Sequence, residues 1–353
     1  MPLEYSSPAM LLDHGFDSLI DVRSPGEYAE DHIPGAINLP VLNDAERARV
    51  GTLYRQNPFE ARKIGAALVF RNAADHVENS LMQRDGGWRP LVYCWRGGQR
   101  SGTLAWMLRE IGWRSEVIAG GYRSWRRLVK AALYDRPLPH RLVLLDGDTG
   151  TAKTALLHRL AARGVQVVDL EGLANHRGSL LGARPGGQPA QKGFETALAA
   201  RLARLDPARP VLVEAESNKI GERNLPPSLW AAMRAAPRIR VSAPIEARAR
   251  FLDEAYDDVL SDAARLKELL DWLRPHRGHA VVDGWFSLID SGERLALTRA
   301  LIEQHYDLAY RRSRKRAGAP CTEVEALSLD ASGVAATAAR IEAALGEIVP
   351  QEG

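Results

Sequence analysis

Apolar and polar positions alternate along this chain as short apolar runs separated by amphipathic stretches. Four apolar runs with the length and composition of strands stand in the first part, at residues 18–22, 36–40, 91–94 and 116–121. Four more follow further on, at residues 141–147, 165–170, 210–217 and 238–244. The stretches between the later runs are rich in Ala, Leu and Arg, as helices are. The pattern predicts an α/β fold with parallel sheets.

The chain is longer than one hydrophobic core usually spans, since it has 353 residues. The segment YDRPLPHR, Tyr134 to Arg141, has two prolines and no periodicity, and a new strand begins directly after it. We therefore predict a linker there and two domains, residues 1–137 and 138–353, with a parallel sheet in the second.

Composition excludes several classes of protein. Apolar residues make up 45% of the chain, which is ordinary for a soluble globular protein, and no run of about 18 uncharged apolar residues occurs. The first residues do not show a basic region followed by an apolar one, so we expect a cytoplasmic protein without a membrane partner. The two cysteines, Cys94 and Cys321, predict neither a disulfide framework nor a metal site. Cys321, in the loop-like segment GAPCTE, is interpreted as incidental.

Charge is uneven although the net charge is only +3. The run RRSRKR holds Arg311, Arg312, Arg314 and Lys315, which we predict to contact RNA phosphates. A solvated helix face is the alternative interpretation of this run.

The segment CWRGGQRS, Cys94 to Ser101, joins the end of an apolar strand to a helix that Gly112 can terminate. Its backbone amides, together with Arg96 and Arg100, would stabilise an anion at the centre of the loop. We predict a catalytic thiolate at Cys94 with a lowered pKa, assisted by both arginines. A buried structural cysteine is the alternative.

These residues resemble the rhodanese superfamily. The resemblance covers LIDVRSPGEYAEDHIPGAINLP (Leu19 to Pro40), the Cys94 loop and IAGGYRSW (Ile118 to Trp125), and it implies a domain that carries sulfur or selenium on the loop cysteine. The spacing Cys-x5-Arg is one residue longer than the ordinary rhodanese loop and similar to that of dual-specificity phosphatases. The wider loop suits selenophosphate or phosphate. Trp95 could stack on a target base or cover the geranyl chain of a substrate, and packing is the alternative.

A second motif, GDTGTAKT, stands between a strand and a helix, as a P-loop does. Its predicted phosphate-binding residues are Gly147, Asp148, Thr149, Gly150, Thr151, Ala152, Lys153 and Thr154. Lys153 would neutralise phosphate charge, and Thr154 can hold a magnesium ion. Ala152 replaces the last glycine of the usual pattern, which is tolerable where its φ is negative.

Further polar residues are candidate contacts for substrate or tRNA. The strand run PVLVEAES ends in Glu214 and Glu216 rather than in the usual aspartate, and Glu216 is one candidate. His176, Arg177 and Ser179 could clamp a diphosphate or tRNA, and a solvated loop is the alternative.

The order of the two domains, with EGLANHRGS (Glu171 to Ser179), VEAESNKIG (Val213 to Gly221) and IEQHYDLAY (Ile302 to Tyr310), closely resembles the tRNA 2-selenouridine synthase family. The resemblance implies a bacterial transferase that acts on wobble 2-thiouridine in tRNAs for Lys, Glu and Gln. Such an enzyme attaches geranyl from geranyl diphosphate to the sulfur, then replaces S-geranyl with selenium from selenophosphate. Selenium would be carried on Cys94, the diphosphate would bind the P-loop, and no tightly bound cofactor is expected.

Three other functions remain open from the residues. A Cys-x5-Arg phosphatase or sulfurtransferase would use the same cysteine loop but leaves the P-loop unexplained. A P-loop kinase with a regulatory rhodanese module would turn over nucleotide without Cys94. A non-catalytic tRNA-binding protein would form no adduct at Cys94.

Overall fold

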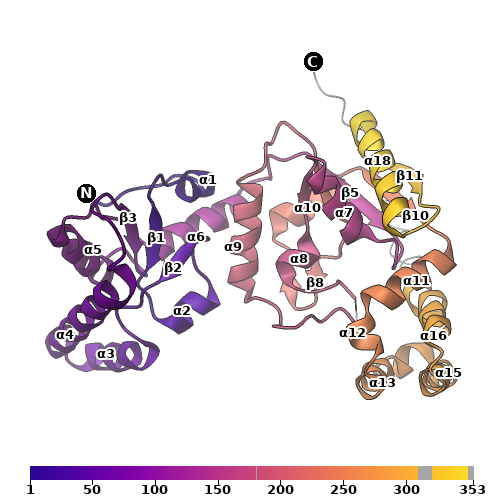
Figure 1. Cartoon of the computed structure of the whole chain (residues 1–353), viewed down its shortest axis with the longest axis horizontal. Coiled ribbons are helices and arrows are strands. Elements are labelled where there is room, and N and C mark those ends of the chain that lie inside the picture. The colour runs from indigo at the N-terminus through magenta and orange to yellow at the C-terminus, as the bar shows by residue number, and fades with distance from the viewer. Residues whose placement is uncertain (180, 309–319, 349–353) are drawn as a thin grey trace. The chain divides into compact units, whose positions relative to one another are not determined.

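The computed structural model describes residues 1–179, 181–308 and 320–348 and shows two compact units. Unit 1 comprises residues 1–136 and 189–204, and unit 2 comprises residues 137–188 and the described part of 205–353. Residues 189–204, which the linear division places in the second domain, pack in unit 1. Figure 1 colours the chain along its sequence and labels the elements of both units.

Unit 1 contains a four-stranded parallel sheet in the order β2-β1-β3-β4. Its strands are β1 (Ser18–Asp21), β2 (Ala36–Asn38), β3 (Pro90–Tyr93) and β4 (Glu116–Val117). β3 is buried along its whole length and β1 along most of it, because both lie inside the sheet. The four predicted strands are confirmed; β1, β2 and β4 are shorter than their apolar runs, and β3 begins and ends one residue earlier than its run.

Helices surround this sheet, with α3, α4 and α5 on one side of the strands and α1 and α6 on the other (Figure 1). The helical elements are α1 (Pro8–Leu12), α2 (Pro25–Glu30), α3 (Asp44–Gln56), α4 (Pro58–His76), η1 (Val77–Leu81), α5 (Gln99–Ile111), α6 (Tyr122–Lys130), η2 (Ala131–Asp135) and α9 (Gln191–Leu202). Gly112 ends α5 with φ +111°, as predicted. The predicted linker is too long at its start, because Tyr134 and Asp135 belong to the π-helix η2.

Unit 2 contains a five-stranded parallel sheet in the order β11-β10-β5-β7-β6. Its strands are β5 (Leu142–Gly147), β6 (Gln166–Val168), β7 (Val211–Glu214), β10 (Arg238–Ser242) and β11 (Cys321–Glu325). β11 was not predicted, and the interpretation of Cys321 as a loop residue is wrong: Cys321 is the first residue of this strand. A short hairpin, β8 (Lys219–Ile220) with β9 (Arg223–Asn224), follows β7.

Two apolar cores support unit 2. One lies between the sheet and two long helices, α7 (Lys153–Ala162) and α18 (Ala331–Ile348). The other joins helices of the segment 245–306 around Trp285. The remaining helices are α8 (Leu170–Ala174), α10 (Pro227–Ala235), α11 (Ile245–Ala255), α12 (Asp257–Leu260), α13 (Ala263–Asp271), α14 (Arg274–Arg277), α15 (His279–Asp290), α16 (Arg294–Leu301) and η3 (Ile302–Tyr306). Within the described residues, none of the helices is both long and apolar enough to cross a membrane.

Candidate active sites at two strand ends

The Cys94 loop fills the gap between the end of β3 and the start of α5. It packs tightly against the segment before α6, so two positions require glycine. Gly97 has φ +64°, and a Cβ there would lie 2.5 Å from Ile118 O. Gly121 has φ +57°, and its Cβ would overlap Cys94 O. A side chain at either position would force these two backbone segments apart.

Hydrogen bonds and charge favour the thiolate form of Cys94. The side chain is buried, and its Sγ accepts hydrogen bonds from Gly98 N–H (3.3 Å) and Ser101 Oγ (3.2 Å). Burial alone would raise the pKa of this thiol. The hydrogen bonds from Ser101, the charge of Arg100 and the Arg96 N–H together lower the pKa below its ordinary value. The loop thus favours the thiolate, which is the form in which a cysteine acts as a nucleophile.

The two predicted arginines of the loop lie in different settings. Arg100 donates to Glu27 Oε2 at 3.1 Å, so its position is fixed by an ion pair with α2. Arg96 is exposed, and none of the described carboxylates pairs with it. Arg96 is therefore available for an incoming anion, whereas Arg100 would have to share its charge with Glu27.

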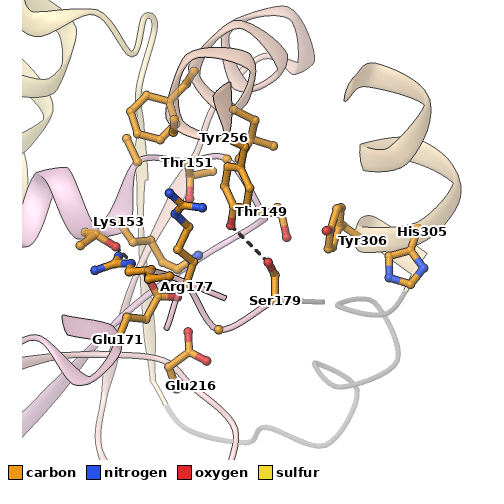
Figure 2. A pocket seen from close by; sticks show the side chains of 18 residues that line it. Thr149, Thr151, Lys153, Glu171, Arg177, Ser179, Glu216, Tyr256, His305 and Tyr306 are labelled. Atoms are coloured by element: carbon orange, nitrogen blue, oxygen red, sulfur yellow. Dashed lines mark hydrogen bonds between the residues drawn. The ribbon is translucent and has the colours of Figure 1, made fainter. Parts of the chain in front are cut away.

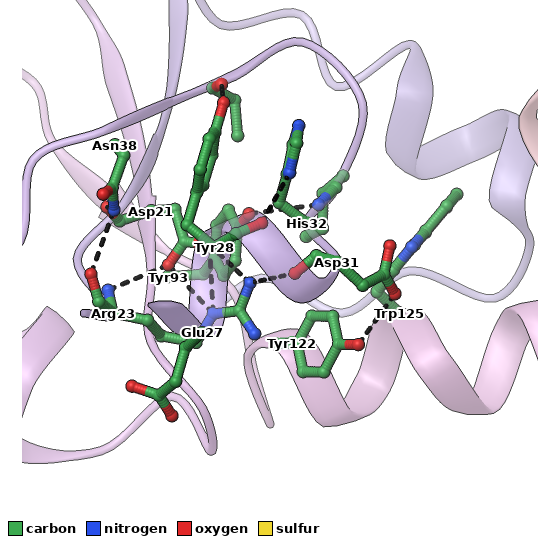
Figure 3. Close-up of polar contacts among 12 residues, drawn as sticks. Asp21, Arg23, Glu27, Tyr28, Asp31, His32, Asn38, Tyr93, Tyr122 and Trp125 are labelled. Atoms are coloured by element: carbon green, nitrogen blue, oxygen red, sulfur yellow. Dashed lines mark hydrogen bonds and ion pairs between the residues drawn. The ribbon is translucent and has the colours of Figure 1, made fainter. Parts of the chain in front are cut away.

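The aspartate and arginine of the sequence LIDVR, Asp21 and Arg23, belong to a buried network of polar contacts in unit 1. Arg23 pairs with Asp21 at 2.6 Å, with both side chains fully buried, and it also donates to Asp31 O at 2.7 Å. Its guanidinium lies 3.9 Å from the ring centroid of Tyr122 (Figure 3). Tyr122 in turn donates to Asp31 Oδ2 at 2.7 Å. This network connects β1 and α2 to the start of α6.

The second site is the loop between β5 and α7. Gly150 has φ +85°, and a Cβ there would lie 2.9 Å from the side chain of Leu252. Ala152, however, has φ +57° and ψ 31°, so the condition under which its methyl group is easily tolerated, a negative φ, is not met. A methyl group in this left-handed region costs about 1 kcal/mol. The Ala152 side chain is buried in the sheet core, which offsets part of this cost.

The lysine and threonine of the loop contact different groups. Lys153 Nζ donates to Gly147 O at 3.0 Å, so its ammonium lies over the loop. Thr154 Oγ1 lies 3.2 Å from Glu171 Oε2 and 3.0 Å from Glu214 Oε1. Glu214 also accepts from Glu171 N–H at 3.1 Å. Thr154 is therefore surrounded by two carboxylates at the place where P-loops hold magnesium.

The carboxylates of this site hold their protons more tightly than usual. Burial raises the pKa of Glu214 well above its ordinary value, and the charge of Glu171 raises it further. Burial and Glu171 also raise the pKa of Glu216, while Lys153 opposes the shift. Burial raises the pKa of Glu171 itself. Each of these shifts favours the neutral form of the carboxyl group, which repels a bound anion less than a carboxylate does.

A cavity of about 450 Å³ opens over this loop (Figure 2). P-loop residues 149–154 line one part together with Arg177, Ser179 and Glu216. Its other wall is largely apolar and comprises Phe251, Leu252, Ala255, Tyr256 and Tyr306. The cavity thus joins the predicted phosphate-binding loop to an apolar wall.

Arg248, a residue that the sequence analysis missed, supports the loop below this cavity. Its Nε donates to Thr149 O at 2.8 Å, and its two terminal nitrogens pair with Asp307 at 2.6 and 3.1 Å. The guanidinium is buried, so it fixes the loop rather than meeting a ligand. Little in the sequence indicates this role, because Arg248 is one of many arginines in a helical stretch.

Only some of the remaining predicted site residues line the cavity. Arg177 pairs with Asp258 at 3.0 Å, and Ser179 Oγ lies 3.2 Å from Tyr256 Oη. His176 does not line the cavity, and its Nδ1 accepts from Gly178 N–H at 3.1 Å. The cations at 311, 312, 314 and 315 lie outside the described residues.

Ser101 and Glu171 were also missed as site residues. Both stand in motifs that the sequence displays, but their contacts depend on how neighbouring elements pack. Among the described residues, no group of three or more His, Cys, Asp or Glu side chains could hold a metal ion.

The two sheets and their loops define a protein that joins a rhodanese-like domain to a P-loop domain, and the predicted fold class is confirmed. The family described as "Rhodanese-like domain" matches residues 8–128, and the "tRNA 2-selenouridine synthase AAA domain" matches residues 140–271. Proteins named tRNA 2-selenouridine synthase are similar to much of the chain. The chain belongs to the tRNA 2-selenouridine synthase family.

Three relatives define the extent of this similarity. The protein of Alcanivorax borkumensis is 39% identical over 67% of this chain and 66% of its own length. The one of Nitrosomonas europaea is 39% identical over 67% of this chain and 63% of its own length. The one of Chromohalobacter salexigens is 37% identical over 74% of this chain and 70% of its own length. The chain thus spans slightly under two thirds of the first two relatives.

Proposed function

We propose that this chain is a transferase that converts 2-thiouridine at the wobble position of tRNA into 2-selenouridine. The relatives' shared name supports the reaction, and each of the two loops would serve one of its steps. The observation that carries the proposal is the pairing, in one chain, of an activated thiol with a P-loop that faces an apolar wall. We expect tRNAs for Lys, Glu and Gln as substrates.

The first proposed step is geranylation at the P-loop. The sulfur of 2-thiouridine attacks C1 of geranyl diphosphate, the C–O bond breaks, the diphosphate leaves, and the N3 proton of the base is released. Lys153 and the loop amides would stabilise the charge that develops on the departing diphosphate. The wall around Phe251 and Tyr256 would bury the geranyl chain, which has no polar atoms.

Magnesium fits this step as an accessory ligand. Mg²⁺ takes oxygen ligands and commonly binds through one or two carboxylates together with substrate phosphates. Thr154, with Glu171 or Glu214, offers such oxygens beside the loop. The ion would neutralise part of the charge of the bound diphosphate.

The second proposed step replaces sulfur with selenium at the Cys94 loop. Attack of the Cys94 thiolate on phosphorus would break the P–Se bond of selenophosphate and release selenide beside the RNA. The selenide adds to C2, the C2–S bond breaks and geranylthiolate leaves, while water hydrolyses the S-phosphocysteine to phosphate and the free thiol. Selenium in selenophosphate is already fully reduced, so this exchange requires neither an oxidant nor a reductant. The loop amides and Arg96 would hold the phosphoryl group of the donor near Cys94. A covalent selenium adduct on Cys94 stays a prediction; its S–Se bond would require a two-electron oxidant, and the exchange described above does not pass through it.

Mass spectrometry of nucleosides tests the proposal. An anticodon stem-loop RNA that contains 2-thiouridine is incubated with the protein, geranyl diphosphate, selenophosphate and Mg²⁺. We expect S-geranyl-2-thiouridine to appear first and 2-selenouridine to follow. An RNA that folded protein leaves unchanged, in the presence of both donors, would contradict the proposal.

A phosphatase is the second candidate, because the Cys-x5-Arg loop and the lowered pKa of Cys94 would also suit phosphate esters. Release of phosphate from p-nitrophenyl phosphate, lost in Cys94→Ser, would favour it. The P-loop site would then have no part in the reaction.

A further inference from the structure

A second cavity, of about 490 Å³, opens in unit 1 beside the Cys94 loop. Neither step of the proposed reaction uses it. Its lining contains five cations against a single carboxylate, Glu195; the cations are Arg123, Arg126, Arg127, Lys130 and Lys192. Such a lining attracts an anion.

Three of these cations form one face of α6. Arg123, Arg127 and Lys130 are exposed and stand at positions i, i+4 and i+7, whereas Trp125 and Val129 are buried on the opposite face. The rise of an α-helix spaces the first and last of them by about 10 Å. The charge is therefore spread along a line, which fits a row of phosphates better than one small anion.

The single carboxylate of the lining is already neutralised. Glu195 pairs with Arg126 at 2.5 Å and accepts a hydrogen bond from Tyr134 Oη at 2.7 Å. Burial and the charge of Glu195 raise the pKa of Tyr134 to about 12, so this tyrosine stays neutral. Arg126 and Glu195 thus hold α9 against α6 and contribute little net charge to the cavity.

The other four cations of the lining remain available to bind an anion. Among the described residues, no carboxylate pairs with Arg123 or Arg127. Lys130 meets a carboxylate only at 4.0 Å, and Lys192 pairs with the exposed Glu30 at 2.7 Å. Exposed pairs of this kind contribute little and exchange readily for a phosphate.

The cationic face starts at the reactive loop itself. Tyr122 N–H donates to Cys94 O at 2.8 Å, and Arg123 N–H donates to Trp95 O at 3.1 Å. The ring of Trp95 lines the same cavity, 5.2 Å from the ring of Tyr122. A chain that follows the cations of α6 would therefore pass the indole and reach the vicinity of Cys94.

We propose that this cavity binds single-stranded RNA, with Arg123, Arg127, Lys130 and Lys192 on backbone phosphates and Trp95 stacked on a base. Cationic grooves with aromatic rings are the usual means of holding unpaired nucleotides. The proposal rests on the proposed function, because it supplies the tRNA contact beside the thiol. It also explains why the anticodon loop, rather than a helical stem, would be presented to Cys94.

Fluorescence anisotropy with a labelled anticodon stem-loop RNA tests this inference in the full-length protein. The variant is Arg123→Glu/Arg127→Glu, and the matched control is Arg62→Glu/Arg71→Glu, which makes the same charge change at exposed positions of α4. We expect at least tenfold weaker binding for the variant and less than a twofold change for the control. The slope of log affinity against log salt should become shallower by about 1.4, since two phosphate contacts are lost.

Two further readouts separate the outcomes. Trp95→Ala should weaken binding severalfold without changing the salt slope, because stacking releases no counterions. Iodoacetamide labelling of Cys94 at the wild-type rate would show that unit 1 of each variant is folded. RNA binding by the α6 variant at wild-type strength would overturn the proposal. Displacement of the RNA by micromolar inorganic phosphate would also overturn it, since it would identify a small-anion site.

The inference and the proposed function fail in different ways. If wild type binds the RNA through α6 but forms no modified nucleoside, the reaction is wrong and the RNA site stands. If wild type modifies the RNA and the α6 variant does so with an unchanged KM, the RNA site is wrong and the reaction stands.

Discussion

The Cys94 loop and the P-loop are built alike and differ in the side chains around them. Each follows a buried parallel strand, each needs glycines with positive φ, and each is followed by a helix. The Cys94 loop holds a thiol whose pKa is lowered, whereas the P-loop faces carboxylates whose pKa values are raised. Backbone topology thus provides two loops suited to an anion, and the surrounding residues differ in the chemistry that they favour.

The largest effect should follow from removal of the nucleophile. Cys94→Ser should lower the rate of selenium incorporation by at least about 10³-fold, because a hydroxyl is a far weaker nucleophile at neutral pH. Geranylation should continue near the wild-type rate. Nucleoside mass spectrometry measures both rates in one sample, with Cys321→Ser as the control for a cysteine outside the loop. Loss of geranylation in Cys94→Ser would mean that the two loops do not act separately.

Lys153→Ala should have the next largest effect and should act on the other step. Its ammonium would no longer stabilise the departing diphosphate, so geranylation should fall by at least about 10²-fold. Exchange of selenium into RNA that already carries S-geranyl should be unaffected. Lys219, an exposed lysine of the same unit, gives the control variant Lys219→Ala. Equal losses in both variants would contradict the role of Lys153.

Ser101→Ala should produce a smaller change at the first loop. Without the hydroxyl that lies 3.2 Å from Cys94 Sγ, the pKa of the thiol should rise, and alkylation at pH 7 should slow by about tenfold. The measurement is the rate of iodoacetamide labelling from pH 5 to 10. Ser115→Ala, at another buried serine, is the control and should leave the profile unchanged. A wild-type profile in Ser101→Ala would show that this hydrogen bond does not set the reactivity.

Glu216→Gln should have the smallest effect, on stability rather than on rate. Because folding raises the pKa of this carboxyl to about 8, the folded state binds its proton more tightly than the unfolded state does. The resulting stabilisation is full below about pH 4.3 and is lost as pH rises to 8 and beyond.

Wild type should therefore lose more unfolding free energy between pH 5 and 9 than Glu216→Gln, by about 1 kcal/mol, since the side chain is half-buried. Urea denaturation at the two pH values measures this difference. The exposed carboxylate of Glu222 supplies the control variant Glu222→Gln. Parallel pH dependence of wild type and Glu216→Gln would contradict the raised pKa.

The sequence near each loop predicted the features that depend only on neighbouring residues. The spacing of apolar residues predicted the strands before both loops and the helix after Cys94. The position of Gly112 predicted where that helix ends. The left-handed φ of Ala152 was not predicted, because an alanine adopts this backbone conformation only where packing in the surrounding core stabilises it. Local preference gave way to packing at that residue.

Contacts between distant segments lay beyond sequence reasoning. Residues 189–204 follow the P-loop in the chain, yet Thr196 accepts from Trp125 Nε1 at 3.1 Å and donates to Asp31 at 3.0 Å in unit 1. The cationic cavity depends on this packing, since Lys192 and Glu195 reach it only through α9. The two carboxylates beside Thr154 likewise come from two separate strand ends, Glu171 after β6 and Glu214 at the end of β7.

The central claim, that two loops perform two successive steps, is tested most directly by supplying the intermediate. Stem-loop RNA that carries S-geranyl-2-thiouridine is given with selenophosphate to wild type, Lys153→Ala and Cys94→Ser, and 2-selenouridine is measured by mass spectrometry. The account predicts that Lys153→Ala forms it at the wild-type rate and that Cys94→Ser forms none. Failure of Lys153→Ala, or full conversion by Cys94→Ser, would contradict the assignment of one step to each loop.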